Sequence, residues 1–494
     1  MKPLEAPFYP IIYVRGYAMT PSEIAATVAT PYMGFNLGST KVRQAWDGAI
    51  QRRVFESPLV RLMKDWGYRD IYTNGSEIQS EIPARSVVIY RYYDAADTDF
   101  GGGKALTIVE AAQGLKELIH KLRDQVCGND AKCQNAFRVY LVAHSMGGLV
   151  CRSFLQNDGI STQADRDLVD KVFTYATPHN GIEMAGINVP AVLSLWDLNN
   201  FNRSKMAGDL GLQGTPDRVD TLDGKYDPQR FFCFVGTNHR DYEVALGLSR
   251  TLAGEMSDGL VKISNATVQD APRAFAYRSH SGIYGVVNSE EGYQNLTRFL
   301  FGDLRVDGTL EVSALPLPPS VQKAKDAGKQ VRASYYFEAT VAPRGADQYR
   351  LTERRRDTYS AILRSFDELL RVEKADLDAP RSPQLFSVFL DSDRITVGNT
   401  VVFSMELAVS TTGYTIDNKL WFDQHVEGEY LFRDTLVVRI TLRNGGWNLR
   451  YLLADSSSSE NMGTLVEPQD DCYMIPLASD KGFRAELKLA VQRR

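Results

Sequence analysis

The sequence contains no long apolar run and no surplus of basic residues, and each absence argues against a class of protein. No stretch of about 18 apolar residues occurs, and Met1–Pro7 has proline and glutamate where a secretory signal needs an apolar core. We therefore expect a cytoplasmic protein, unless it is exported by a route that needs no cleaved signal. The net charge of −5 and the lack of a Lys/Arg run argue against nucleic acid as a partner.

Cysteine is also scarce. Five cysteines in 494 residues do not make a disulfide framework, and their odd number leaves at least one unpaired. Cys127 and Cys133 bracket a turn-like segment, so a local bridge is one interpretation, but we expect free thiols because a reducing compartment disfavours disulfides. No second Cys or His pair lies at zinc-ligand spacing, and we expect neither a metal nor a cofactor.

The length of the chain exceeds what one hydrophobic core usually supports, so we expect two domains. The proline-rich segment 315–320 and the charged residues that follow it interrupt all periodicity. We place a linker at residues 311–331, between a first domain at 1–310 and a second at 332–494.

In the first domain, short apolar segments alternate with amphipathic ones, which is typical of an α/β fold with a mostly parallel central sheet. Strands are expected at 11–14, 86–92, 138–144, 171–176, 231–235 and 273–277, and helices from Ser57-Pro58 to Gly67, over 105–126 and over 289–301. Residues 182–230 break this pattern with an apolar stretch at 189–196 and a polar remainder. We interpret them as a cap or lid over the site, the alternative being an ordinary surface excursion.

The second domain alternates apolar and polar residues with period two, which predicts an antiparallel β-sandwich-like domain. Strands are expected at 333–341, 384–390, 400–407, 435–441 and 485–491. No cluster of candidate catalytic residues appears among them.

A candidate nucleophile follows the strand at 138–144. That strand runs without a spacer into Ser145, Met146 and Gly147, the layout of a nucleophile elbow, in which small residues must flank the serine two positions away. Ala143 and Gly147 meet this need, although Ala143 replaces the usual glycine. The Ser145 hydroxyl should then stand above the sheet, with the backbone N–H of Met146 free to bind an oxyanion.

A serine hydroxyl is a weak nucleophile unless a histidine and an orienting carboxylate activate it, and in this fold they follow it in the order acid, then histidine. His280, just beyond the last strand, is our candidate base, and His239 on an earlier loop is the alternative. Asp258, before a glycine, is our candidate acid, with Glu255 and Asp241 as rivals in the same connection.

The second oxyanion donor should come from the loop after the first strand. There Gly16 lies just past the sheet edge, and the N–H of Tyr17 is the candidate.

Taken together, these motifs resemble those of the α/β-hydrolase superfamily and, within it, the bacterial lipase and esterase branch that includes lipases similar to the GPI inositol-deacylases. The motifs are Arg15-Gly16-Tyr17, Ala143–Gly148, Thr177–Gly181, Ser257–Val261 and Ser279–Gly282. The resemblance covers about the first three hundred residues. It implies that Ser145, Asp258 and His280 form the triad and that Tyr17 and Met146 are the oxyanion amides.

The same resemblance bears on neighbouring residues. It implies that His179, in Thr-Pro-His-Asn-Gly, borders the acyl pocket and is not the base. Arg15 stands where the family usually has a histidine, so it would alter the packing of the loop or place a cation near the substrate. The C-terminal domain resembles β domains appended to some lipases, which suggests transient contact with a membrane or lipid surface.

Our hypothesis from the sequence is a serine carboxyl-ester hydrolase that acts through an acyl-enzyme on lipid or other acyl-ester substrates. His144, His179 and Trp196 are expected to line the substrate, Trp196 from the apolar segment 189–196. Thioesterase, amidase or acyltransferase chemistry would use the same residues, because the fold does not set the leaving group. A catalytically silent binding protein on a hydrolase scaffold is the alternative from another class.

Overall fold

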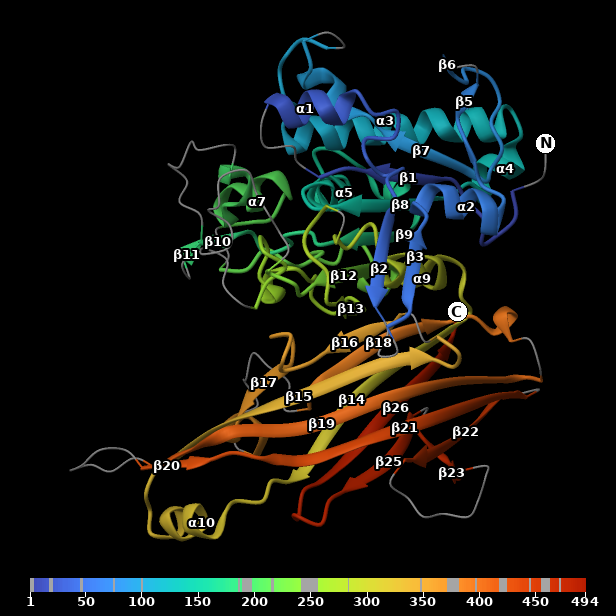
Figure 1. The fold of residues 1–494 in the computed structure, drawn as a ribbon. Helices are drawn as coiled ribbons and strands as arrows, with labels where there is room; N and C mark the ends of the chain where they lie inside the picture. Colours follow the sequence, from blue (N-terminus) through green and yellow to red (C-terminus); the bar gives the residue numbers. More distant parts are fainter. Residues whose placement is uncertain are drawn as a thin grey trace. The chain divides into compact units, whose positions relative to one another are not determined.

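The computed structural model divides into two compact units: Met1–Arg273 with Tyr277–Phe301, and Gly302–Arg494, with which Ala274–Ala276 are grouped. Figure 1 traces both units. The structure describes residues 4–16, 21–44, 48–73, 76–98, 101–184, 187–188, 198–214, 217–240, 256–282, 284–346, 349–370, 382–395, 398–416, 424–443, 446–454, 463–470 and 472–494.

The first unit is built on a seven-stranded sheet with the order β13-β12-β9-β8-β1-β7-β4. Its strands are β1 (Ile11–Val14), β4 (Arg69–Asp70), β7 (Ser86–Tyr90), β8 (Val139–His144), β9 (Val169–Tyr175), β12 (Phe231–Gly236) and β13 (Arg273–Ala276). The strands from β4 to β12 pair in parallel with their neighbours. The strands β1 and β12 are buried at every position, as expected where a parallel sheet is covered on both faces. The predicted mostly parallel sheet is confirmed.

Helices connect these strands. They are α1 (Pro21–Val28), α2 (Pro58–Trp66), α3 (Ile108–Cys127), α4 (Ala131–Ala136), α5 (Gly147–Gln156), α6 (Gln163–Arg166), α7 (Arg203–Asp209) and α9 (Glu290–Phe301). The start of α3 is set by a capping box between Thr107 and Glu110. Helix α3 packs on α5, and α5 packs on β8 and β1 (Figure 1). The helix that follows the candidate serine therefore packs both on the central strands and on α3.

Short elements complete the first unit. They are the hairpins β2 (Ser39–Gln44) with β3 (Ile50–Phe55), β5 (Tyr72–Thr73) with β6 (Ser76–Glu77) and β10 (Glu183–Met184) with β11 (Ile187–Asn188), and the 3₁₀ turns η1 (Tyr92–Ala96), η2 (Leu198–Phe201), η3 (Pro228–Arg230) and η4 (Ile263–Asn265). The predicted cap at 182–230 thus contains β10, β11, η2, α7 and η3, whereas its apolar stretch at 189–196 lies outside the described residues.

The second unit consists of a five-stranded sheet, β18-β14-β26-β25-β24, and an eight-stranded sheet, β16-β15-β19-β21-β22-β23 with β17 and β20 attached. The strands are β14 (Leu304–Ala314), β15 (Val331–Pro343), β16 (Thr352–Arg354), β17 (Ile362–Ser365), β18 (Gln384–Leu390), β19 (Thr400–Ile416), β20 (Gln424–Glu427), β21 (Tyr430–Arg443), β22 (Gly446–Leu453), β23 (Thr464–Val466), β24 (Pro468–Gln469), β25 (Cys472–Ala478) and β26 (Arg484–Arg493). The remaining elements are α10 (Pro319–Asp326), α11 (Phe366–Leu370) and η5 (Ser392–Arg394).

Strand pairing in the second unit is antiparallel, as in β15 with β19 and β14 with β26. One face of each sheet contributes to a common hydrophobic core, to which Phe337 and Met405 come from one sheet and Val306 and Leu487 from the other. The predicted antiparallel character of this region is confirmed by this pairing. Period-two alternation indicates such sheets because it places apolar side chains on one face of each strand, which is then buried.

Two features differ from the sequence-based expectations. The second unit begins at Gly302, and residues 311–331, expected as a linker, contain the end of β14 and helix α10. The expectation of free thiols at Cys127 and Cys133 is wrong, because a disulfide joins them. Asp130 accepts hydrogen bonds from the N–H groups of Lys132 and Cys133, and this tight turn brings the two cysteine Cα atoms to 5.3 Å.

Candidate active site

Ser145 occupies a strained turn between β8 and α5. Its φ is +51°, in the left-handed region that costs a non-glycine residue about 1 kcal/mol or more. Two hydrogen bonds hold it there: its N–H donates to the carbonyl of Tyr175 at 2.9 Å, and the Thr177 hydroxyl donates to its carbonyl at 2.8 Å. The surrounding structure thus imposes the conformation of the serine.

Two glycines allow the loop after β1 to run against this turn. A Cβ on Gly147 would lie 2.3 Å from the carbonyl oxygen of Val14, and one on Gly16 would lie 2.5 Å from the Cβ of Ser145. Neither position can therefore carry a side chain without moving the backbone. Ala143, which replaces the usual first glycine, is fully buried within β8, so its methyl group is accommodated there.

His280 bridges Ser145 and Asp258. Its Nε2 lies 3.0 Å from the Ser145 Oγ, across 135 residues of sequence, and its Nδ1 lies 2.9 Å from the Asp258 Oδ2. The exposed fractions of Ser145, Asp258 and His280 are 6%, 1% and 3%. Because the three residues follow β8, β12 and β13, they gather at the carboxyl end of the sheet, where α/β folds place their sites.

The carboxylate of Asp258 is oriented by its own turn. Its Oδ1 accepts hydrogen bonds from the N–H groups of Leu260 at 3.0 Å and Val261 at 2.8 Å. The N–H of His280 donates to the backbone carbonyl of Asp258 at 3.0 Å, so the acid and histidine loops are joined through backbone and side chain. The rival acids, Glu255 and Asp241, lie outside the described residues.

The backbone N–H of Met146 is available for an oxyanion. Met146 is the N-cap residue of α5, and among the described residues its N–H has no hydrogen-bond partner. Tyr17, expected to supply the second donor, lies outside the described residues. Its neighbour Gly16 approaches the Ser145 turn closely, as described above.

Part of the first unit matches a known protein family. Residues 77–206, which include β7, α3, β8, the serine turn and β9, match the family model of the PGAP1-like alpha/beta domain. The first unit has the α/β-hydrolase fold. The match agrees with the parallel sheet and with the position of Ser145 on a strained strand-to-helix turn.

Three solved structures show similarity to this chain. Aspergillus fumigatus lipase B is 13% identical with a TM-score of 0.30, over 60% of this chain and 53% of the lipase. A putative cell surface hydrolase from Lactobacillus plantarum WCFS1 is 14% identical with a TM-score of 0.24, over 60% of this chain and 91% of its own. A chain of the Tle4-Tli4 complex is 14% identical with a TM-score of 0.22, over 58% of this chain and 66% of that one. This chain thus spans about half the length of the lipase, and no curated protein matched it.

His144, expected to line the substrate, contacts the loop that carries His280. Its Nε2 donates to the backbone carbonyl of His280 at 2.9 Å. Burial, the neighbouring His280 and the Arg15 cation lower the pKa of His144 to about 3, so the ring is neutral at physiological pH. Arg15 itself donates to the backbone carbonyl of Met33, which ties the loop after β1 to the segment following α1.

His179, also expected to line the substrate, is fully buried in the α/β-hydrolase unit. Its Nε2 lies 3.1 Å from the hydroxyl of Thr174, and its ring packs edge-on against Phe231. Burial and the nearby Arg152 hold the pKa of His179 well below its usual range. Trp196, the third expected lining residue, lies outside the described residues.

Arg152 is a structural residue that the sequence analysis missed. Its fully buried guanidinium donates to the backbone carbonyls of His179 at 2.7 Å, Val219 at 2.5 Å and Thr221 at 2.7 Å. Burial lowers the pKa of Arg152 to about 10, so it remains charged at neutral pH. Arg152 is the one charged residue in α5, and this was the available signal, because a buried charge needs a full set of partners.

The described residues contain no group of three or more His, Cys, Asp or Glu side chains that could hold a metal ion. Within the same described ranges, none of the helices is long and apolar enough to cross a membrane.

Proposed function

We propose that this protein is a serine carboxyl-ester hydrolase that forms an acyl-enzyme on Ser145. The observation that carries the proposal is the hydrogen-bonded series Ser145, His280 and Asp258, with heavy-atom distances of 3.0 and 2.9 Å. These distances lie within hydrogen-bond range, as required between a nucleophile and its base and between that base and an orienting carboxylate.

In the proposed acylation step, the Ser145 Oγ attacks the ester carbonyl carbon while the His280 Nε2 takes the hydroxyl proton. The N–H of Met146 stabilises the negative charge that develops on the carbonyl oxygen. When the tetrahedral intermediate collapses, the bond to the alcohol breaks and His280 returns the proton to that alcohol. Water then attacks the acyl-enzyme by the same route. Asp258 holds the Nδ1–H tautomer of His280 and stabilises the imidazolium without being protonated.

The substrate class is proposed as lipid or other acyl esters, on the strength of the apolar segment 189–196 in the sequence. Thioester, amide or acyl-transfer chemistry would use the same three residues. The alternative of a silent binding scaffold is disfavoured by the strained φ of Ser145, because binding alone gives no reason to hold a serine at +51°.

The proposal is tested by labelling with a fluorophosphonate and by turnover of p-nitrophenyl esters. We expect Ser145→Ala to abolish both while its thermal unfolding stays that of the wild type. Ser204→Ala is the matched control, because Ser204 is exposed on α7 and outside the hydrogen-bonded series. Unchanged turnover in Ser145→Ala would exclude the proposed nucleophile.

A further inference from the structure

The loop after β1 is joined to the end of the neighbouring strand β7. In the sheet register Val14 pairs with Tyr90, so the segments that follow the two strands leave the sheet side by side. The first of these segments carries Arg15 and Gly16, and the second turns into η1 at Tyr92. The hydroxyl of Tyr92 donates to the backbone carbonyl of Arg15 at 2.8 Å. This hydrogen bond ties the loop after β1 to η1.

The position of the Tyr92 hydroxyl is set by packing. The side chain is buried, and its ring lies against those of Tyr90 and Tyr93, with ring centres 5.3 and 4.5 Å away. A buried aromatic ring among such neighbours has little freedom to turn. Burial and the adjacent Tyr93 also raise the pKa of Tyr92 well above its usual range, so the hydroxyl keeps its proton and remains a donor.

The chain after α1 is held from the same place. Arg91, the residue before Tyr92, donates to three backbone carbonyls at and just beyond the end of α1. They belong to Val28, Thr30 and Pro31, at 2.8, 3.1 and 2.9 Å. Two hydrogen bonds of 2.9 Å to the carboxylate of Asp94 orient the guanidinium. Two adjacent residues, Arg91 and Tyr92, therefore fix the chain on both sides of α1.

The contact of Tyr92 matters because it reaches the neighbourhood of the candidate nucleophile. The carbonyl of Arg15 and the N–H of Gly16 belong to one planar peptide group, so a donor that holds the carbonyl also sets the place of Gly16. A Cβ on Gly16 would lie 2.5 Å from the Cβ of Ser145, which shows how closely this backbone approaches the serine. Tyr17, the candidate for the second oxyanion donor, is the next residue in the sequence.

We propose that Tyr92 is a positioning residue for ester hydrolysis at Ser145, because its hydroxyl holds the loop after β1 in place beside the developing oxyanion. This inference rests on the function proposed for Ser145. Donors stabilise a tetrahedral intermediate only when they already stand where the negative charge develops. A loop that is free to shift weakens binding of the transition state more than binding of the substrate, so the loss falls on kcat and not on KM.

The test is Tyr92→Phe, which removes the hydroxyl and keeps the ring. We expect the kcat for p-nitrophenyl acetate to fall by about fivefold, the effect of losing one hydrogen bond, with little change in KM. A trifluoromethyl ketone, whose adduct with Ser145 carries an oxyanion, should bind more weakly by a similar factor. Amide hydrogen exchange in the peptide that contains the end of β1 and Gly16 should become faster.

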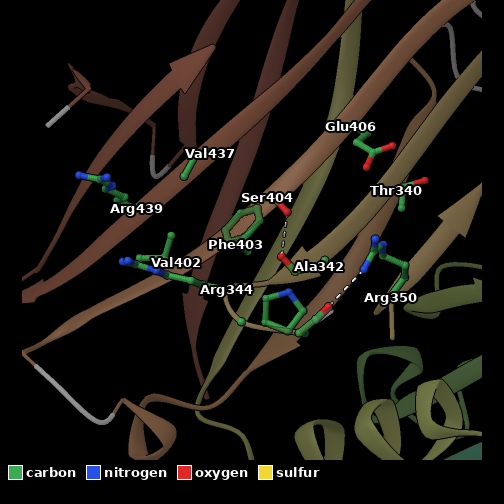
Figure 2. Close-up of a pocket in the computed structure, with 13 residues that line it drawn as sticks. Thr340, Ala342, Arg344, Arg350, Val402, Phe403, Ser404, Glu406, Val437 and Arg439 are labelled. Carbon is green, nitrogen blue, oxygen red and sulfur yellow. Dashed lines mark hydrogen bonds between the residues drawn. The ribbon is translucent and has the colours of Figure 1, made fainter. Parts of the chain in front are cut away.

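Tyr90→Phe is the matched control. The Tyr90 hydroxyl also donates to a backbone carbonyl at 2.8 Å, but that carbonyl belongs to Ala111 in α3. Ser404→Ala is a control in the second unit. It removes the hydrogen bond of 3.4 Å from the Ser404 hydroxyl to the carbonyl of Ala342, in the wall of a cavity of about 430 Å³ over β15, β19 and β21 (Figure 2). Both controls should keep the kcat and the hydrogen exchange near Gly16 of the wild type.

The inference is overturned if Tyr92→Phe keeps the kcat of the wild type, or if Tyr90→Phe loses as much. Labelling with a fluorophosphonate should still reach completion in Tyr92→Phe, at a lower rate, because Ser145 and His280 are retained. Failure of the function proposed for Ser145 would look different. The wild type itself would then neither be labelled nor turn over the ester, and the role of Tyr92 would fall with that function.

Discussion

The imidazole of His144 donates a hydrogen bond of 2.9 Å to the backbone carbonyl of His280. The residue that precedes the proposed nucleophile therefore holds the loop of the proposed base. The two rings lie 5.1 Å apart, and the low pKa of His144 keeps its ring neutral, so a second positive charge does not oppose the imidazolium formed during acylation. His144 is thus expected to act as a positioning residue.

Replacement of His144 tests this role. His144→Ala should lower the kcat for p-nitrophenyl acetate by about fivefold with little change in KM, because losing one hydrogen bond of about 1 kcal/mol lets the His280 loop move. His144→Gln, whose amide can still donate, should recover part of the loss. An equal kcat in His144→Ala and wild type would show that the hydrogen bond does not position the base.

The proposed acid is tested by Asp258→Asn. We expect an intact fold and a turnover number lower by about 10⁴, because the amide favours the wrong tautomer of His280. Asp217→Asn, at an exposed position, serves as the control. If Glu255→Gln has the larger effect on turnover, Glu255 and not Asp258 is the acid.

Arg152 is expected to contribute strongly to the stability of the first unit. Arg152→Met removes the donor to three backbone carbonyls and should destabilise this unit by several kcal/mol, on the order of 3–5, because buried acceptors are left without partners. Scanning calorimetry should show the transition of the first unit lowered and that of the second unchanged. Arg52→Met, at an exposed position, is the control, and an equal transition in both variants would contradict the prediction.

The stability of the first unit should fall as the pH falls below 6.5. Folding lowers the pKa of His144 to about 3 and that of His179 well below its usual range, whereas both titrate near 6.5 in an unfolded chain. The unfolded state therefore binds more protons in this window, and stability that is fully present above pH 6.5 is lost on acidification. The slope is about 1.4 kcal/mol per pH unit for each histidine.

This prediction is checked by urea unfolding between pH 7.5 and 5. His179→Asn should reduce the slope, while His425→Asn, at an exposed position in β20, should leave it unchanged. A pH-independent unfolding free energy in the wild type would show that the two buried imidazoles are not held neutral by folding.

The features that depend on residues close together in the sequence could be predicted from the sequence alone. The turn at Ser145 depends on small neighbours at Ala143 and Gly147, and period-two or helical spacing depends on residues close in sequence, so both are visible in the chain. The sequence places the end of the first domain at residue 310, whereas the second unit begins at Gly302. The reason is that the proline-rich segment 315–320 interrupts the pattern more strongly than the start of β14 does.

The sequence by itself determined the two fold classes and the candidates Ser145, Asp258 and His280, because strand periodicity, small residues at the turn and chain order are local properties. Only the tertiary structure decided that the His280 imidazole lies between the other two, that His144 supports its backbone, and that Arg152 joins three carbonyls. These contacts join segments brought together by the packing of a whole sheet, and no local pattern encodes the direction in which a distant side chain points.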